Sequence, residues 1–164
     1  MVPVTASTVI DLPREQIFDY LSDIANYAEF SDHYLVDWRL TREDPVGLGA
    51  GARFRFKQPL NRFGWGDLSI VDLQPPYRIV LRGRGGKFNR VKMVAIYELT
   101  DRHSGGTDLK YSFETDASMP SDRLREIFGG RRWVRRNSRK ALKRIDAILE
   151  RDGRRGARPT VAAG

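Results

Sequence analysis

The chain has 164 residues, of which 40% are hydrophobic and 30% charged, as expected for one globular domain. It has no run near the roughly 18 to 20 apolar residues of a membrane span and no signal-peptide pattern after Met1, so we expect a cytoplasmic protein. The lack of cysteine excludes disulfides, cysteine-ligated metals and a thiol nucleophile, and with only His33 and His103 we expect neither a metal site nor a cofactor. The net charge of +8 comes from the C-terminal part, because residues 121–164 hold 14 Lys and Arg against 5 Asp and Glu, whereas residues 1–120 hold 15 against 16.

The first thirty residues predict one strand followed by two short helices. Residues 4–10 are β-branched and alternating, which is typical of a strand. Pro13 suits the first turn of a helix, where its missing N–H costs nothing. A second short helical piece is predicted over residues 24–30. The apolar side chains of the first helix recur at steps of three and four, at Ile17, Phe18, Leu21 and Ile24.

From residue 34 the apolar period changes from helical to two. Turn residues separate the alternating runs at short, even intervals, which predicts an antiparallel meander with one buried and one wet face. The predicted strands cover residues 35–43, 52–58, 67–73, 77–84, 91–99 and 107–115. Their predicted inward-facing side chains are mostly aromatic: Trp38, Phe54, Phe56, Tyr77, Met93, Tyr97, Tyr111 and Phe113.

The last segment returns to helical periodicity. A short helical piece with Phe128 on its apolar side is followed by Gly129 and Gly130, which should break or bend it, because each glycine costs about 1 kcal/mol in a helix interior. A longer helix is predicted from about Arg131 to Arg151, with one apolar stripe and Arg or Lys around most of the remainder. We expect residues 1–151 to form the domain and residues 152–164 to form a disordered basic tail.

This order of elements predicts an α+β fold of the helix-grip kind. A curved antiparallel sheet of about seven strands must cover its apolar face, and the long C-terminal helix is the only element large enough to do so. A strongly bent sheet leaves room between itself and the helix. Such a cavity is apolar-lined, with a few polar groups that orient a ligand.

The opening segment matches a short pattern: an apolar residue, Pro, another apolar residue and Phe, then Asp, and then Tyr and Phe three residues apart. The residues that meet it are Leu12, Pro13, Ile17, Phe18, Asp23, Tyr27 and Phe30. Together with the order of elements over residues 4–150, this pattern resembles the START-like superfamily (SRPBCC, helix-grip or birch-pollen-allergen-like), which includes polyketide cyclase/dehydrase and lipid-transport proteins. The resemblance implies a cavity for a hydrophobic, lipid- or polyketide-like small molecule, in a fold that hosts both carriers and enzymes.

The predicted ligand-binding residues are the inward-facing strand residues and one residue of the last segment. They are Trp38, Phe54, Phe56, Tyr77, Met93, Tyr97, Tyr111, Phe113 and Phe128. Each of them has plain core packing as its alternative. Trp65, in an aromatic-tipped turn, either folds back on the core or belongs to a lid or membrane-touching tip.

Two further readings remain open. In the first, the protein is a cyclase or dehydratase, in which cavity shape orients the substrate and Tyr97, Tyr111 or His33 moves a proton; for His33 the alternative is an exposed loop residue. In the second, the basic C-terminal helix binds RNA or an anionic membrane surface. The chain is expected to be a monomer or a homodimer.

Overall fold

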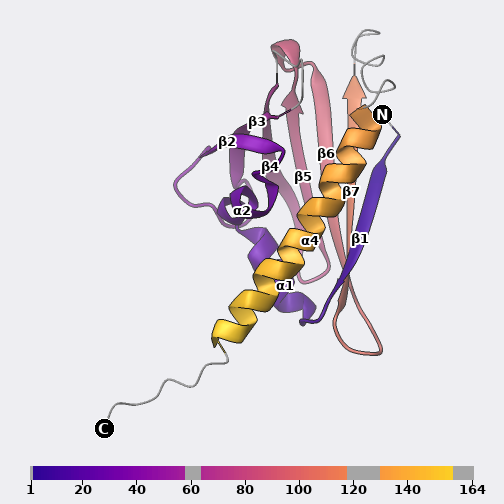
Figure 1. Ribbon diagram of the computed structural model, residues 1–164. Coiled ribbons are helices and arrows are strands. Elements are labelled where there is room, and N and C mark those ends of the chain that lie inside the picture. The colour runs from indigo at the N-terminus through magenta and orange to yellow at the C-terminus, as the bar shows by residue number, and fades with distance from the viewer. Residues whose placement is uncertain (1, 58–63, 118–129, 157–164) are drawn as a thin grey trace.

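The chain forms a single curled antiparallel sheet with helices on its inner side. The computed structural model describes residues 2–57, 64–117 and 130–156. The strand order is β1-β7-β6-β5-β4-β3-β2. This arrangement confirms the predicted α+β helix-grip fold (Figure 1). The strands are β1 (Val4–Ile10), β2 (Leu35–Leu40), β3 (Gly51–Phe56), β4 (Trp65–Gln74), β5 (Arg78–Gly85), β6 (Val91–Asp101) and β7 (Thr107–Ala117).

Three short helical pieces join β1 to β2. Helix α1 (Arg14–Ser22) begins directly after Pro13, as predicted. The 3-10 helix η1 (Ile24–Asn26) is capped by the Asp23 carboxylate, which accepts from the Ala25 N–H at 2.9 Å. Helix α2 (Tyr27–Ser31) follows at once. The second predicted helical piece is therefore a 3-10 turn joined to one turn and a half of α-helix.

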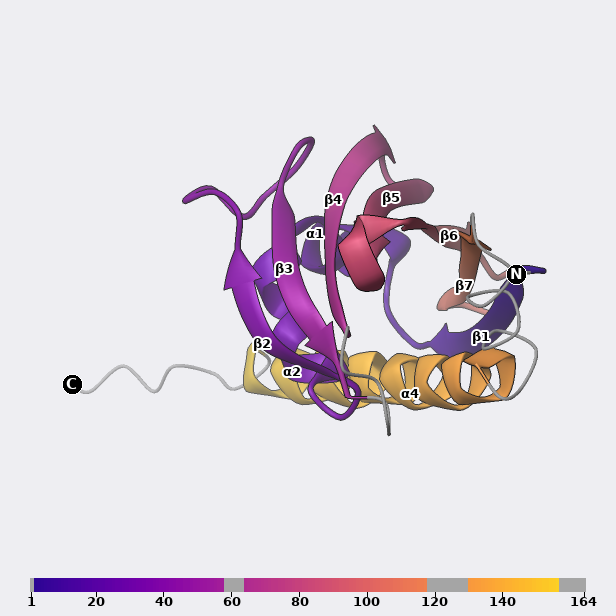
Figure 2. The same cartoon turned by 90° about the horizontal axis from the view of Figure 1, so that it is seen from above.

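Strands β2 to β7 form a meander, and β1 is added to the sheet as the edge strand beside β7. Strand β1 pairs antiparallel with β7, with Val4 opposite Phe113. The long C-terminal helix α4 (Arg131–Gly156) lies across the open side of the curl, as Figure 2 shows from above. Figure 1 shows the same helix running beside β1 and past α2. The sheet and α4 therefore enclose the side chains of the sheet's concave face.

The core lies between that concave face, the short helices and α4. The predicted apolar stripe of α4 is confirmed except at Val134, which is only half-buried. Its other members are at most 7% exposed: Ser138, Ala141, Leu142, Ile145, Ile148 and Leu149. From α1, Ile17 and Leu21 are fully buried against the same core. Burial of this kind stabilises by about 25 cal/mol per Å² of apolar surface.

Most strand boundaries differ from the predicted ones by one or two residues, and two element boundaries differ by more. Strand β2 ends at Leu40 rather than residue 43, and its pairing with β3 shifts between Val36 and Arg39, where Asp37 has a positive φ of 57°. Helix α4 continues through Gly156, so the predicted disordered tail cannot begin at residue 152.

Within the described residues, no helix is long and apolar enough to cross a bilayer. A 3-10 turn, η2 (Lys87–Asn89), joins β5 to β6.

Candidate functional site

Aromatic rings on the concave face form one continuous network from β7 to α4. Tyr111 lies 6.5 Å from Phe113 and 4.9 Å from Tyr97, centroid to centroid, and Tyr97 meets Tyr27 of α2 edge to face at 6.0 Å. Tyr27 then stacks on Trp38 at 6.1 Å. The structure thus brings β6, β7, α2 and β2 together through aromatic contacts, which are favourable beyond their burial.

The network continues from Trp38 toward the N-terminal half of α4. Trp38 stacks on Phe54 at 5.2 Å, and Phe54 meets Phe56 edge to face at 5.3 Å. Phe56 contacts Trp133 of α4 at 6.2 Å, and Trp133 contacts Tyr34 at 5.8 Å. Of the nine predicted ligand-binding residues, six therefore share one network: Trp38, Phe54, Phe56, Tyr97, Tyr111 and Phe113.

The network is completely buried at one end and partly open at the other. Phe54 is 0% exposed and Tyr27 is 4% exposed, so both are ordinary core residues. Tyr34, Trp38, Phe56 and Trp133 are only half-buried. We call these four the open rings. Tyr34 and Trp133 were not among the predicted ligand-binding residues, because Tyr34 stands just before a strand and Trp133 stands among arginines rather than on the apolar stripe.

Several hydrogen-bonding groups of this network have no partner in the part of the chain that the structure describes. The Trp38 Nε1 is buried without an acceptor, and no hydrogen bond forms at the hydroxyls of Tyr97 and Tyr111. Tyr27 differs, since its hydroxyl donates to the Leu21 carbonyl oxygen at 2.9 Å. A buried N–H without a partner costs about 1–3 kcal/mol, and a free hydroxyl can donate, so these groups are suited to receive a ligand's acceptor atoms.

The two tyrosines of β6 and β7 act as neutral donors at ordinary pH. Burial raises the pKa of both Tyr97 and Tyr111 well above that of a free phenol, and neighbouring tyrosines raise it further. Both hydroxyls therefore stay protonated at neutral pH and can polarise a carbonyl by hydrogen bonding. The only buried polar side chains among the described residues are Ser22, Ser31, Thr107 and Ser138, so none of the buried side chains is charged.

The side chain of Met93 packs against two glycines of the sheet, Gly66 and Gly85. A Cβ atom added to Gly66 would meet the Met93 Cε at 3.1 Å and the Phe56 ring at 3.2 Å, and one added to Gly85 would meet the same Cε at 3.2 Å. Met93 is 2% exposed. The absence of side chains at Gly66 and Gly85 thus leaves the volume that Met93 occupies, and its unbranched thioether makes that wall adaptable.

Tyr77 lies outside this site, so its predicted inward position is wrong. It precedes β5, in a turn in which its N–H donates to the Gln74 carbonyl oxygen at 2.7 Å, and its side chain is 51% exposed. The guanidinium of Arg14 lies 4.3 Å above its ring. The predicted alternation was extended one residue before the strand begins. Phe128 and Gly129 lie outside the described residues.

His33 is neither an exposed loop residue nor a neighbour of the Tyr97–Tyr111 pair. Its ring is half-buried, and both nitrogens face α4, with Nε2 at 3.2 Å from the Asn137 carbonyl oxygen and Nδ1 at 3.2 Å from an Arg144 Nη1. Burial lowers the pKa of His33, and the nearby cations Lys140 and Arg144 lower it further, against raising contributions from the Asn137 carbonyl and Asp32. The structure therefore gives His33 a role in holding α4 rather than one beside the tyrosines.

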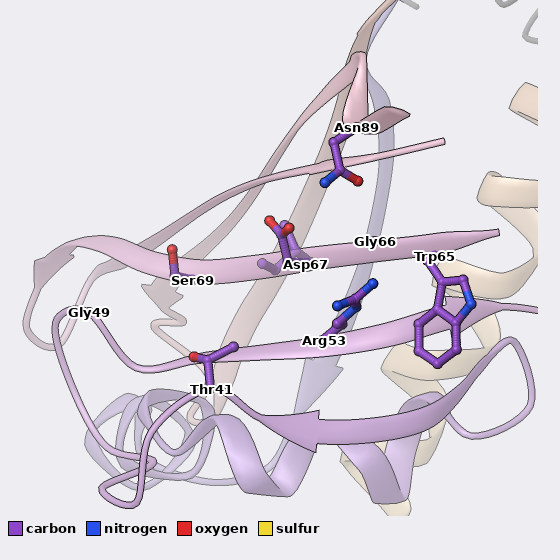
Figure 3. A pocket seen from close by; sticks show the side chains of 9 residues that line it. Thr41, Gly49, Arg53, Trp65, Gly66, Asp67, Ser69 and Asn89 are labelled. Atoms are coloured by element: carbon purple, nitrogen blue, oxygen red, sulfur yellow. The ribbon is translucent and has the colours of Figure 1, made fainter. Parts of the chain in front are cut away.

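A groove of about 400 Å³ lies on the opposite, convex face of the sheet. Arg53 of β3 and Asp67 of β4 are cross-strand partners there, and the Arg53 guanidinium lies 5.2 Å from the Trp65 ring centroid (Figure 3). Trp65 is the first residue of β4 and is half-buried on this outer face, so it neither enters the core nor tips a loop. The groove is separated from the aromatic network by the sheet itself.

Comparison with known proteins supports the same fold assignment. A sequence profile of the family described as "Polyketide cyclase / dehydrase and lipid transport" matches residues 1–150. None of the curated proteins matches the chain.

Solved structures share the fold at low identity. KanY is similar at a TM-score of 0.69 with 12% identity, covering 91% of this chain and 97% of its own. A conserved protein from Geobacillus kaustophilus gives 0.68 with 15% identity, covering 92% and 96%. DynU16, a protein in the dynemicin biosynthetic locus, gives 0.59 with 16% identity over 90% of this chain, which spans about half (47%) of the DynU16 chain.

Proposed function

Because the chain belongs to the polyketide cyclase/dehydrase and lipid transport family, we propose that it binds an uncharged, largely hydrophobic small molecule between the concave face of the sheet and α4. The family and the fold suggest a hydrophobic ligand-binding cavity at this place. The observation that carries the proposal is the set of open rings. Tyr34, Trp38 and Phe56 pack on the buried core without being covered by it, and Trp133 packs on Tyr34 and Phe56.

The chemistry of the walls favours an apolar ligand with hydrogen-bond acceptors. No buried side chain of the described residues is charged, so an ionised ligand group would lack a counter-charge. The indole N–H of Trp38 and the two phenols can donate to keto, ester or hydroxyl oxygens. Flat unsaturated rings stack on tryptophan and phenylalanine at low cost. These features favour a lipid- or polyketide-like molecule.

A second candidate is a cyclase or dehydratase that uses the same space. What favours it is the Tyr97–Tyr111 pair, whose rings lie 4.9 Å apart and whose hydroxyls remain protonated. Two neutral donors can stabilise charge that develops on a carbonyl oxygen, while the aromatic walls orient the chain for closure. His33 contributes no proton in this candidate, because both its nitrogens face α4.

Binding is tested with a fluorescent fatty acid and with native mass spectrometry of the purified protein. We expect saturable micromolar binding of the probe, displacement by other apolar compounds, and a co-purifying small molecule. Val134 is half-buried and packs on the core from α4, so Val134→Trp should fill the site and lower probe affinity at least tenfold. Val71→Trp, at a position 41% exposed, is the matched control and should bind as wild type. No saturable binding by any apolar compound would refute the proposal.

The carrier and the enzyme are then separated with the co-purifying molecule. A carrier returns that molecule unchanged, and the Tyr97→Phe/Tyr111→Phe double variant weakens binding without any change in product. An enzyme converts an open-chain precursor, and the same double variant slows turnover at least a hundredfold while still binding the fatty-acid probe. Mass spectrometry of the recovered small molecule distinguishes the two results.

A further inference from the structure

Outside the proposed ligand site, α4 and β1 together form a second concave surface. A groove of about 660 Å³ runs between them, lined by Ser7, Thr8, Arg132, Arg135, Arg136, Arg139, Lys140 and Lys143. A smaller hollow of about 260 Å³ shares Ser7 and Arg139 with it and adds Thr5, Ala6 and Lys110. We call the two together the α4/β1 groove. Figures 1 and 2 show the helix and the strand side by side along this length.

Within the described residues, Glu98 pairs with Lys110 at 2.8 Å, whereas most of the α4 cations of this groove have no acidic partner. Residues 131–144 contain no Asp or Glu, and β1 contains none either. In the described part of the chain, Arg144 is the cation of α4 that forms an ion pair. It pairs with Asp32, away from the groove. Five others form no hydrogen bond or ion pair there: Arg132, Arg135, Arg136, Arg139 and Lys143. Like charges one turn apart destabilise a helix, so an anionic occupant would relieve a standing repulsion.

The cations are spaced as a row. Arg132, Arg136, Arg139 and Lys143 follow one another at steps of three or four, and therefore recur about every 5.4 Å along one side of the helix. The row is about 16 Å long from its first to its last member. A single phosphate or carboxylate contacts one or two such positions. A row of this length instead matches a polymer that carries a charge on every unit.

The walls of the groove favour a phosphodiester chain over a membrane. A helix that binds a lipid surface needs a free apolar face to insert, but the apolar stripe of α4 is buried in the core. The opposite wall presents the hydroxyls of Ser7 and Thr8. Arginine forks and hydroxyls are the usual partners of backbone phosphate oxygens in nucleic-acid complexes. Among the described residues that line the groove none is aromatic, so bases have no ring to stack on there.

We propose that the α4/β1 groove binds the phosphodiester backbone of a nucleic acid strand without reading its bases. The occupant lies along the outer side of α4, whereas the small-molecule site lies on the inner side of the same helix. The two sites therefore bind independently. With about four phosphates neutralised, the logarithm of the binding constant should fall with the logarithm of salt concentration at a slope of roughly −3 to −4.

The test is fluorescence anisotropy with labelled 20-nucleotide single strands of RNA and of DNA, in two unrelated sequences, between 50 and 200 mM salt. The groove variant is Arg135→Gln/Arg139→Gln. The matched control is Arg39→Gln/Arg82→Gln, which removes two exposed charges from elsewhere on the sheet. We expect wild type and control to bind both sequences alike with the stated salt slope, and the groove variant to bind at least tenfold more weakly. Binding of both RNA and DNA, or of RNA alone, identifies which strand supplies the phosphates.

Other results overturn the proposal. An absence of binding at 50 mM salt would refute the proposal. An equal loss of affinity in the groove and control variants would show that binding depends on the net charge of the protein and not on this groove. Co-sedimentation with vesicles of phosphatidylserine and phosphatidylcholine, lost in the groove variant, would assign the surface to a membrane instead. Thermal melting serves as the folding check. The groove variant should melt at or above the wild-type temperature, because it removes repulsion, so weaker binding cannot be ascribed to unfolding.

Discussion

His33 Nδ1 and Arg144 Nη1 lie 3.2 Å apart, in a contact that ties the segment after α2 to α4. A guanidinium can only donate, so Nδ1 accepts and the ring proton resides on Nε2, which donates to the Asn137 carbonyl oxygen. The other Nη of Arg144 donates to the Glu29 carbonyl oxygen at 2.9 Å. A neutral His33 is thus built into a brace between two helices that are more than a hundred residues apart in sequence.

This brace predicts a loss of stability on mild acidification. The pKa of His33 is lower in the folded chain than the ordinary value of 6.5, because burial and nearby cations disfavour the charged ring. The unfolded chain therefore takes up the proton first as the pH falls. The His33 contribution is complete above about pH 6.5 and declines as the pH drops below it. Urea denaturation between pH 5 and 8, followed by circular dichroism, measures the effect.

The His33→Gln variant separates this residue from the rest of the protein. It should show a smaller fall in unfolding free energy between pH 7 and 5.5 than wild type. His103→Gln, in an exposed turn, should keep the wild-type dependence. An unchanged pH dependence in His33→Gln would show that other groups cause it.

Replacing Trp38 by phenylalanine should change stability little. The indole N–H is buried without an acceptor, so its removal recovers about 1–3 kcal/mol of desolvation cost, which offsets the lost packing volume. We expect a net change within about 1 kcal/mol by urea denaturation. Trp38→Ala should cost about 3–5 kcal/mol, because it also removes the stacks on Tyr27 and Phe54. An equally large loss in Trp38→Phe would mean that the N–H has a partner.

Gly83 is a position where any side chain should disrupt the sheet. A Cβ atom there would lie 1.8 Å from the Asp67 carbonyl oxygen, which is backbone and cannot turn aside. We expect Gly83→Ala to lose at least about 1–3 kcal/mol of unfolding free energy. Gly153→Ala is the matched control, since its Cβ would have one ordinary contact at 4.0 Å and helix propensity favours alanine. The control should melt at the same or a higher temperature.

The core packing of α4 provides a quantitative check on the fold. Leu142 is 2% exposed on the buried stripe, so Leu142→Ala should cost about 2–5 kcal/mol. Leu48 is 61% exposed in a loop, and Leu48→Ala should change stability by less than about 0.5 kcal/mol. Equal effects of the two variants would contradict the burial of the helix stripe.

The strands and the final helix could be predicted because their periods are long and regular. Val91 to Leu99 alternates without interruption, and the structure buries Met93, Ala95, Tyr97 and Leu99 as that alternation requires. The α4 stripe repeats over several turns. The order of the elements and the face of each element that points inward can be predicted from such patterns, because one face of each element must be covered.

The details of the site required coordinates. Trp133 joins the aromatic network although it stands between arginine and valine, and no period marks it. The role of His33 depends on Asn137 and Arg144, over a hundred positions away. Tyr77 was misplaced because the strand pattern does not show where a strand begins. In each case the missing information was the packing of segments distant in sequence.

The pairing of β1 with β7 sets when the chain can fold. Residues 4–10 are synthesised about a hundred residues before their partners, residues 107–113. Until that late segment has been synthesised, the first strand has nothing to pair with, and closing so long a loop is entropically slow. Folding of this domain therefore has to wait for the synthesis of β7, and the edge formed by β1 is the last part of the sheet that can assemble.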